Sequence, residues 1–251
     1  MRVLITRPRE QTDDFAQALI HLGAEPVFFP TTQIAPVQDP GLLDQALQNL
    51  SPYTWLIFTS TNAVRALWER LVHLGIELPT GLRIAAVGPK TARSLVQRGI
   101  PPHFIPEEFT AEAILPGLGD LRGKRVLLPL ADLAHDTLPR AIEAAGGTAH
   151  VLTAYHTRPA DPDPEEIAAL HTGVDVLTFT SGSTVVNFVA LVKRAGLDPF
   201  HLPGNPLVAC IGPKTAGVAR EVGFQVDMVA EEYTVEGLVQ ALSKQVDKIH
   251  R

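Results

Sequence analysis

The feature that most constrains the fold is an internal repeat with a spacing near 124 residues. The pentapeptide Gly88–Ala92 recurs letter for letter as Gly212–Ala216. Further matches keep the same order along the chain, with offsets of 123, 121 and 124 residues: Val3–Ile5 with Val126–Leu128, Phe58–Ser60 with Phe179–Ser181, and Glu107–Thr110 with Glu231–Thr234. Similar turns could recruit similar residues, but four ordered matches favour duplication. We therefore predict that the 251-residue chain consists of two related halves.

Each half alternates short apolar runs with segments of helical periodicity. Trp55–Phe58 and Ile84–Val87 are continuous apolar runs, and residues 11–22 place apolar side chains at helical spacing. A further helix is expected to start within Ala111–Leu115. Uninterrupted apolar strands between helices are typical of parallel sheets covered on both faces. With five strands in each half, we expect an α/β protein with two flavodoxin-like lobes.

Two divisions of the strands between the lobes stay open at this point. A cut near Gly123 would give two sequential domains. Alternatively, the chain crosses between lobes at Pro30–Pro40 and Arg158–Pro164, two proline-rich stretches at equivalent repeat positions. Residues 38–156 would then form one lobe, and both ends of the chain would form the other.

Composition excludes several classes of protein. A chain with 45% hydrophobic residues is not disordered, and a formal net charge of -6 gives no basic field for nucleic acid. No run of about 20 apolar residues is present to span a membrane, and the first residues do not resemble a signal peptide. The single cysteine, Cys210, fits a reducing compartment. We therefore expect a cytoplasmic protein without nucleic-acid or membrane partners.

Hydroxyl-rich turns between strands and helices are the candidate binding sites. Ligands of open parallel sheets bind beyond the carboxyl ends of the strands, where the N-termini of helices attract anions. Gly88–Thr91 and Gly212–Thr215 are such turns, as are Thr59–Asn62 and Thr180–Thr184. The same residues could instead serve only as helix caps.

The sequence lacks the motifs of several common chemistries. It contains no P-loop, dinucleotide fingerprint, His-Glu-x-x-His zinc motif or Gly-x-Ser-x-Gly nucleophile elbow. Cys210 lies in an apolar strand, so we expect burial rather than nucleophilic catalysis. Tyr155 ends a predicted strand and aligns near Thr32, so the first half has no matching phenol. It is therefore a candidate for function or, alternatively, an interface aromatic.

Taken together, these motifs resemble the uroporphyrinogen-III synthase family over essentially the whole chain. The resemblance rests on the segments Val3–Pro8, Phe58–Val64, Leu152–Thr157, Phe179–Ser181 and Ile211–Ala216. It implies two α/β lobes, residues 1–35 with 159–251 and residues 38–156, joined by a two-stranded linker ladder. It also implies an active site in the cleft between the lobes.

The resemblance implies a cyclising hydro-lyase that needs no metal and no cofactor. Linear hydroxymethylbilane would lose water and close to uroporphyrinogen III, with ring D inverted through a spiro intermediate, on the way to haem, sirohaem or cobalamin. Water alone closes the unflipped isomer, so the enzyme must orient its substrate and select one transition state. The partner is a small-molecule linear tetrapyrrole, and the family implies a monomer.

The resemblance also assigns roles to particular residues. Tyr155 would assist departure of the hydroxyl group as a catalytic proton donor or hydrogen-bond partner. Substrate carboxylates would be bound by hydroxyls, helix N-termini and cations: Thr6, Arg7, Ser60, Thr61, Asn62, Lys90, Thr91, Ser181, Gly182, Ser183, Lys214 and Thr215. Many family members have Arg where this chain has Asn62.

Two other classes of protein stay open on the residues alone. A duplicated flavodoxin-like chain could be a non-catalytic two-lobed binding protein that closes on an anionic small molecule. A pair of signalling receiver domains would need a phosphoacceptor Asp at a strand end. Val3–Pro8 and Val126–Ala131 contain none, although Asp132 lies close by.

Overall fold

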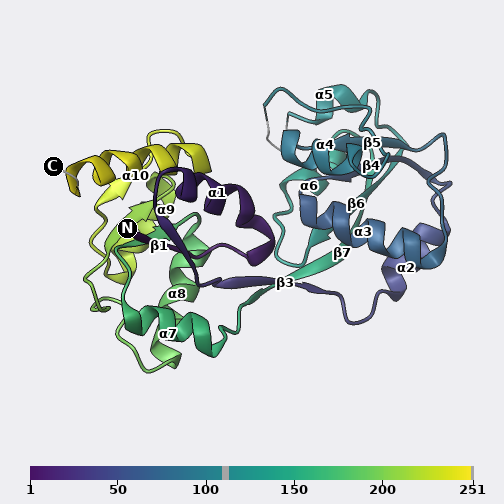
Figure 1. Ribbon diagram of the computed structural model, residues 1–251. Coiled ribbons are helices and arrows are strands. Elements are labelled where there is room, and N and C mark those ends of the chain that lie inside the picture. Colours follow the sequence, from purple (N-terminus) through teal and green to yellow (C-terminus); the bar gives the residue numbers. More distant parts are fainter. Residues whose placement is uncertain (109–112, 250–251) are drawn as a thin grey trace. The chain divides into compact units, whose positions relative to one another are not determined.

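The computed structural model describes residues 1–108 and 113–249, which form two five-stranded sheets covered by helices (Figure 1). The chain divides into two compact units. Lobe 1 combines Met1–Gln33 with Arg158–Arg251, and lobe 2 is Ile34–Thr157. The predicted α/β class with parallel sheets is confirmed.

In lobe 1 the strand order is β10-β9-β8-β1-β2, and every neighbouring pair is parallel. The strands are β1 (Arg2–Ile5), β2 (Glu25–Phe28), β8 (Val176–Phe179), β9 (Leu207–Cys210) and β10 (Met228–Val229). Alternate strand residues pack on opposite faces. One face is covered by α1 (Asp13–His21) and α10 (Val235–Ile249), and the other by α7 (Pro164–Thr172), α8 (Gly182–Arg194) and α9 (Pro213–Val222).

In lobe 2 the strand order is β3-β7-β6-β4-β5, with parallel pairing from β7 through to β5. The strands are β3 (Thr32–Pro36), β4 (Tyr53–Phe58), β5 (Arg83–Ala86), β6 (Arg125–Ala131) and β7 (Thr148–Pro159). One face is covered by α2 (Gly41–Gln48), α3 (Thr61–Leu74) and α4 (Pro89–Val96), and the other by α5 (Leu115–Leu118) and α6 (Thr137–Ala144).

Each sheet takes strands from both halves of the repeat. Lobe 1 joins β1 and β2 of the first half to β8, β9 and β10 of the second, which is the flavodoxin-like strand order. Lobe 2 has the same order in β7-β6-β4-β5, continued by a single bridge between Ala85 and Phe104. The chain passes between the units inside β3 and β7, which are neighbours in one sheet. The duplication itself stays a prediction.

One expected strand and one expected helix differ in the structure. Of the five strands expected in the first half, the last forms only a bridge at Phe104, because the flanking prolines Pro101, Pro102 and Pro106 have no N–H to donate to a ladder. The helix expected to start within Ala111–Leu115 falls partly on residues 109–112, which lie outside the described residues. The short helix α5 begins at Leu115.

The aromatic cluster of lobe 1 generates a stability prediction. Phe188 is fully buried on α8, and its ring centroid lies 5.6 Å from that of Phe29 and 5.4 Å from that of Phe179. We expect Phe188→Ala to lower the free energy of unfolding by about 3–5 kcal/mol, because it leaves a cavity in the core. Urea denaturation followed by far-UV circular dichroism measures this loss.

Val186→Ala is the matched control, because Val186 lies on the same helix and is 50% exposed. It should change the free energy of unfolding by no more than about 0.5 kcal/mol. Equal effects of the two substitutions would contradict the packing described for Phe188.

Candidate functional site

The carboxyl edge of the lobe 2 sheet brings the predicted residues Tyr155 and Ser60 together. Because β4, β6 and β7 run parallel, they end at the same edge. Ser60 caps α3, where its Oγ accepts a hydrogen bond from the Ala63 N–H at 3.1 Å. The same Oγ lies 3.1 Å from the Tyr155 hydroxyl oxygen. One hydrogen serves the bond between the hydroxyls, so the pair keeps a second hydrogen to donate to a ligand.

An irregularity in β7 turns the Tyr155 side chain toward this edge. Leu130 pairs with Thr153, whereas the next residue, Ala131, pairs with Tyr155, so one extra residue is inserted in β7. Side chains of a regular strand alternate between faces. Here the consecutive residues Ala154 and Tyr155 both pack in the cluster beneath α3, because the bulge re-aims the second of them.

A pocket of about 370 Å³ opens beside Tyr155 and is lined by residues of lobe 2 alone. Asn62, from the first turn of α3, and Arg65, one turn later, both line it. Arg70 lines it as well but is bound to Asp44, with 2.8 Å between Nε and Oδ1. Within residues 1–108 and 113–249 no carboxylate is paired with Arg65. Arg65 is thus a cation available to an acidic ligand, which the sequence reasoning missed.

The Gly88 turn lies next to the Ser60 turn on the same edge. The Val87 N–H donates to the Phe58 carbonyl at 2.8 Å, which joins the residue after β5 to the last residue of β4. Gly88 has φ 101°, a conformation that favours glycine, and Pro89 then begins α4. In the following helical turn Lys90 is exposed and Thr91 is buried.

A second polar cluster at this edge was not predicted as a site. Asp132 follows β6, and its carboxylate accepts the Thr157 N–H at 3.0 Å and lies 2.9 Å from His156 Nδ1. Its position in the sequence could have indicated it, because Asp132 comes directly after the strand β6 and Ser60 comes shortly after the strand β4. From the sequence, Asp132 was considered only as a phosphoacceptor.

In lobe 1 the predicted residue Thr6 serves the sheet itself. Thr6 is fully buried, and its hydroxyl donates to the Thr178 carbonyl at 2.7 Å. The Thr178 hydroxyl donates in turn to the Leu4 carbonyl at 2.6 Å. The two threonines therefore link β1 to β8, and we leave Thr6 out of the binding residues proposed below.

The Ser181 turn of lobe 1 is built like the Ser60 turn of lobe 2. Ser181 caps α8 by accepting the Thr184 N–H at 3.3 Å, and its Oγ lies 2.9 Å from that of the exposed Ser183. A Cβ at Gly182 would lie 3.0 Å from Val218 Cγ2, so glycine allows α8 and α9 to pack closely. The predicted residue Thr61 starts α3 at the corresponding place in lobe 2.

The remaining predicted residues of lobe 1 lie at its carboxyl edge. The Ile211 N–H donates to the Phe179 carbonyl at 2.9 Å and brings the two turns together. Lys214 is exposed and Thr215 is buried in the first turn of α9. Arg7 follows β1 and donates to Gln11 Oε1 at 3.2 Å. Burial lowers the pKa of the Arg7 guanidinium, against the opposing effect of two nearby carboxylates, but an arginine remains charged at neutral pH.

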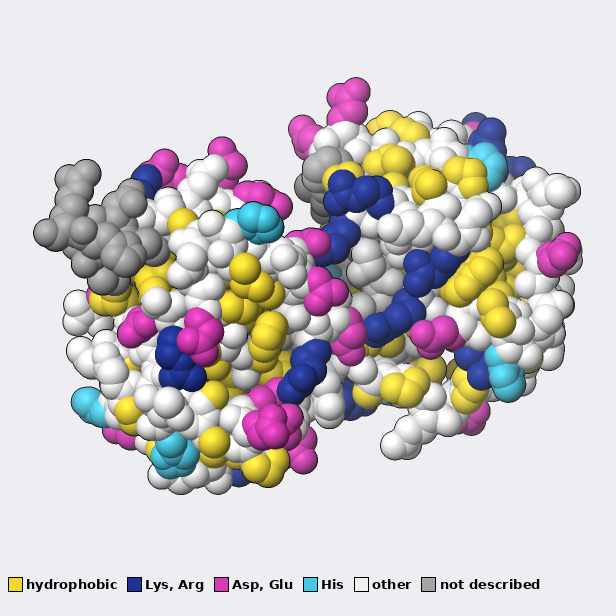
Figure 2. All heavy atoms as spheres, viewed as in Figure 1, with side chains coloured by type: hydrophobic (Ala, Val, Ile, Leu, Met, Phe, Trp, Pro, Cys, Tyr) yellow, Lys and Arg dark blue, Asp and Glu magenta, His cyan; other side chains and the backbone are white. Residues whose placement is uncertain are grey.

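The charged residues of the chain are divided unevenly between the two lobes. Lobe 2 has nearly as many Lys and Arg as Asp and Glu, so most of the net negative charge lies in lobe 1. Figure 2 shows several Lys and Arg side chains close together on lobe 2.

In the described part of the chain, no group of three His, Cys, Asp or Glu could hold a metal ion, and no helix is long and apolar enough to cross a membrane.

Cys210 is buried on β9, and burial raises the pKa of its thiol to about 11. Because the thiolate is the reactive form, we expect the folded protein not to react with Ellman's reagent near pH 8. In denaturant one thiol per chain should react, which serves as the internal control. Rapid labelling of the folded protein would contradict the burial of this strand.

Comparisons with known proteins show which family the chain resembles in sequence and in fold. The sequence profile of the family described as uroporphyrinogen-III synthase HemD matches residues 13–240. The uroporphyrinogen-III synthase of Synechococcus elongatus is 32% identical over 250 residues, covering 96% of this chain and 94% of the relative. That of Chlorobaculum parvum is 27% identical, with coverages of 96% and 98%. A crystal structure of a mutant uroporphyrinogen III synthase from the extremely thermophilic bacterium Thermus thermophilus superposes with a TM-score of 0.62, at 26% identity and 99% coverage of both chains. By this profile and these relatives, the chain belongs to the uroporphyrinogen-III synthase family.

Proposed function

We propose that this chain cyclises the linear tetrapyrrole hydroxymethylbilane to uroporphyrinogen III, as a hydro-lyase of tetrapyrrole biosynthesis. Family membership supports the reaction. The observation that carries the proposal at the level of residues is the Tyr155–Ser60 hydroxyl pair. That pair lies beside a pocket whose Arg65 is available to a substrate carboxylate.

The hydroxyl pair fits the first chemical step. The C–O bond of the hydroxymethyl group breaks, the pyrrole nitrogen supplies the electrons that form an azafulvene cation, and the departing oxygen leaves as water. The hydrogen that the pair can still donate would assist this departure. The substituted carbon of ring D then attacks to form the spiro intermediate, and fragmentation and recombination invert that ring. These steps use orientation of one flexible chain rather than a protein nucleophile.

The substrate carries carboxylates, so its binding groups should be cations and hydrogen-bond donors. We propose that lobe 2 supplies Ser60, Thr61, Asn62, Arg65, Lys90 and Thr91, and that lobe 1 supplies Arg7, Ser181, Gly182, Ser183, Lys214 and Thr215. One substrate molecule would bind both sets, as the family resemblance implies. A single chain carries both sets, which supports a monomer, and neither metal nor cofactor enters the proposed steps.

The first prediction of this proposal concerns the product. Freshly prepared hydroxymethylbilane should yield mainly the type III isomer with the protein, and mainly the unflipped isomer without it. Chromatographic separation of the oxidised porphyrins measures the ratio. An isomer ratio equal to that of the buffer control would contradict the proposed enzyme activity. It would favour the alternative, a non-catalytic binding protein for an anionic small molecule.

A second prediction concerns Tyr155. We expect Tyr155→Phe to lower kcat by about one to two orders of magnitude, because a donor to the departing hydroxyl is lost while Ser60 remains. Tyr53→Phe is the matched control, since Tyr53 lies at the opposite end of the lobe 2 sheet and its hydroxyl contacts His150. Similar kcat values for the two variants would remove Tyr155 from the mechanism.

A third prediction separates binding from chemistry. Arg65→Leu should raise KM about tenfold with a smaller change in kcat, because a charge-assisted contact to a substrate carboxylate is lost. Arg65→Lys should recover part of the affinity. Arg122→Leu is the control, because Arg122 is exposed in the same lobe and paired with Asp120. An unchanged KM for Arg65→Leu would exclude this contact.

A further inference from the structure

Lobe 2 contains a second pocket, of about 550 Å³, at the opposite edge of its sheet from Tyr155. It is lined by the loop between α3 and β5 and by the loop that follows α4. Its apolar wall includes Trp68, Ile76, Leu78 and Ile100, and Arg98 and His103 are among its polar residues. None of these residues belongs to the candidate site described above.

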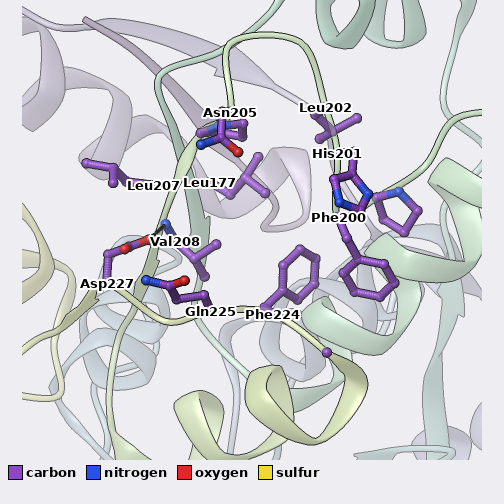
Figure 3. Close-up of a pocket in the computed structure, with 13 residues that line it drawn as sticks. Leu177, Phe200, His201, Leu202, Asn205, Leu207, Val208, Phe224, Gln225 and Asp227 are labelled. Carbon is purple, nitrogen blue, oxygen red and sulfur yellow. Dashed lines mark hydrogen bonds between the residues drawn. The ribbon is translucent and has the colours of Figure 1, made fainter.

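The repeat provides an internal comparison for this pocket. Lobe 1 has a pocket of about 350 Å³ at the equivalent position (Figure 3). With the 124-residue offset that holds from Gly88 onwards, Ile100 corresponds to Phe224, and Phe200 also lines the lobe 1 pocket. The two phenylalanine rings lie 4.9 Å apart between centroids and occupy one side of the lobe 1 pocket. Because isoleucine is smaller than phenylalanine, the lobe 2 pocket keeps space that aromatic rings take in lobe 1.

The polar residues of the two pockets differ in character. Asp227 in lobe 1 accepts the Val208 N–H at 2.8 Å, and His103 at the equivalent position of lobe 2 accepts the Ile84 N–H through Nδ1 at 3.1 Å. When Nδ1 accepts, Nε2 of the neutral ring carries the hydrogen and acts as a donor. The lobe 2 pocket therefore has a donor where the lobe 1 pocket has a carboxylate.

Arg98 lines this pocket, and its guanidinium group is only partly hydrogen-bonded. Its Nη1 donates to the Ser94 carbonyl and hydroxyl at 2.8 and 2.9 Å. Its Nε is buried without a hydrogen-bond partner and is the one such side-chain atom among the described residues. Glu77 also lines the pocket, but no ion pair joins it to Arg98 in that part of the chain. The guanidinium charge of Arg98 therefore has no carboxylate partner among the described residues, and an anion in the pocket would provide one.

We propose that this pocket is a binding site for a small carboxylate with an aromatic or branched apolar body. The apolar body would pack against Trp68, Ile76, Leu78 and Ile100, while the carboxylate would accept hydrogen bonds from Arg98. Small-molecule sites commonly combine an apolar wall with a few placed polar groups. The proposal is independent of the reaction proposed above, because its residues lie at the other edge of the sheet.

Tryptophan fluorescence tests the proposal directly, with 4-iodobenzoate as the probe. The chain has two tryptophans, and Trp68 lines the pocket while Trp55 is 2% exposed and bound to the Leu118 carbonyl. The iodine atom should quench Trp68 in a saturable manner. The uncharged analogue 4-iodobenzamide should bind about tenfold more weakly, because it lacks the charge that Arg98 recognises. Equal affinity for the two probes, or quenching that never saturates, would overturn the proposal.

Variants identify the groups responsible. Arg98→Met should lower the affinity for 4-iodobenzoate to that for the amide, while Arg93→Met, an exposed arginine on α4, should leave it unchanged. Ile76→Phe with Ile100→Phe adds two aromatic rings to the pocket, comparable to Phe200 and Phe224 in lobe 1, and should abolish binding, with circular dichroism as the test of folding. Binding that survives either Arg98→Met or the folded double variant would exclude this site. If the double variant does not fold, the comparison of the two probes on the unmodified chain still decides.

Discussion

Parallel pairing around the central strands is the constraint on which the rest of the structure depends. β1 and β4 each have a parallel neighbour on both sides, so the turns that follow them emerge at one edge of their sheet. Hydrogen bonds from Val87 to Phe58 and from Ile211 to Phe179 continue the pairing beyond the strand ends. They hold the N-termini of neighbouring helices together. Pro89 and Pro213 have no N–H, so the donors for an anion come from the residues that follow them.

The central strands could be predicted because they are buried on both faces and read as continuous apolar runs. The elements that connect the lobes could not be predicted in this way. β7 extends over Thr148–Pro159, far beyond the apolar pair Val151–Leu152, and its outer half carries polar side chains. β3 lies inside a proline-rich stretch that indicated a connector. Both strands are held by backbone hydrogen bonds to their neighbours, which leave little trace in side-chain patterning.

Only part of the candidate site could be predicted from the sequence. Sequence motifs predicted Ser60 and Tyr155 as candidate site residues, but the contact between them depends on the bulge in β7, which no residue pattern indicated. Arg65 and Arg70 look equivalent along α3, and only the distant residue Asp44 distinguishes them, by neutralising Arg70. Thr6 shows the opposite case. A hydroxyl at a strand end resembles a binding group, but its hydrogen is donated to the neighbouring strand, so only its oxygen lone pairs remain for a ligand. The three-dimensional partner, rather than the residue type, decides which polar groups remain for a ligand.

The proposed binding of a polyacid by an acidic chain is not a contradiction once distances are considered. At physiological ionic strength charges separated by more than about 8 Å are largely screened, so the net charge of -6 contributes little at the site. In the proposed binding mode, Arg65 and the N-terminus of α3 would act within hydrogen-bond range, in a partly buried pocket where screening is weaker. The concentration of negative charge in lobe 1 would also oppose non-specific binding of anions over its surface. Selectivity for one folded conformation of the substrate is better supplied by a few donors at fixed positions than by a uniformly basic surface, because a uniform field attracts every conformation equally.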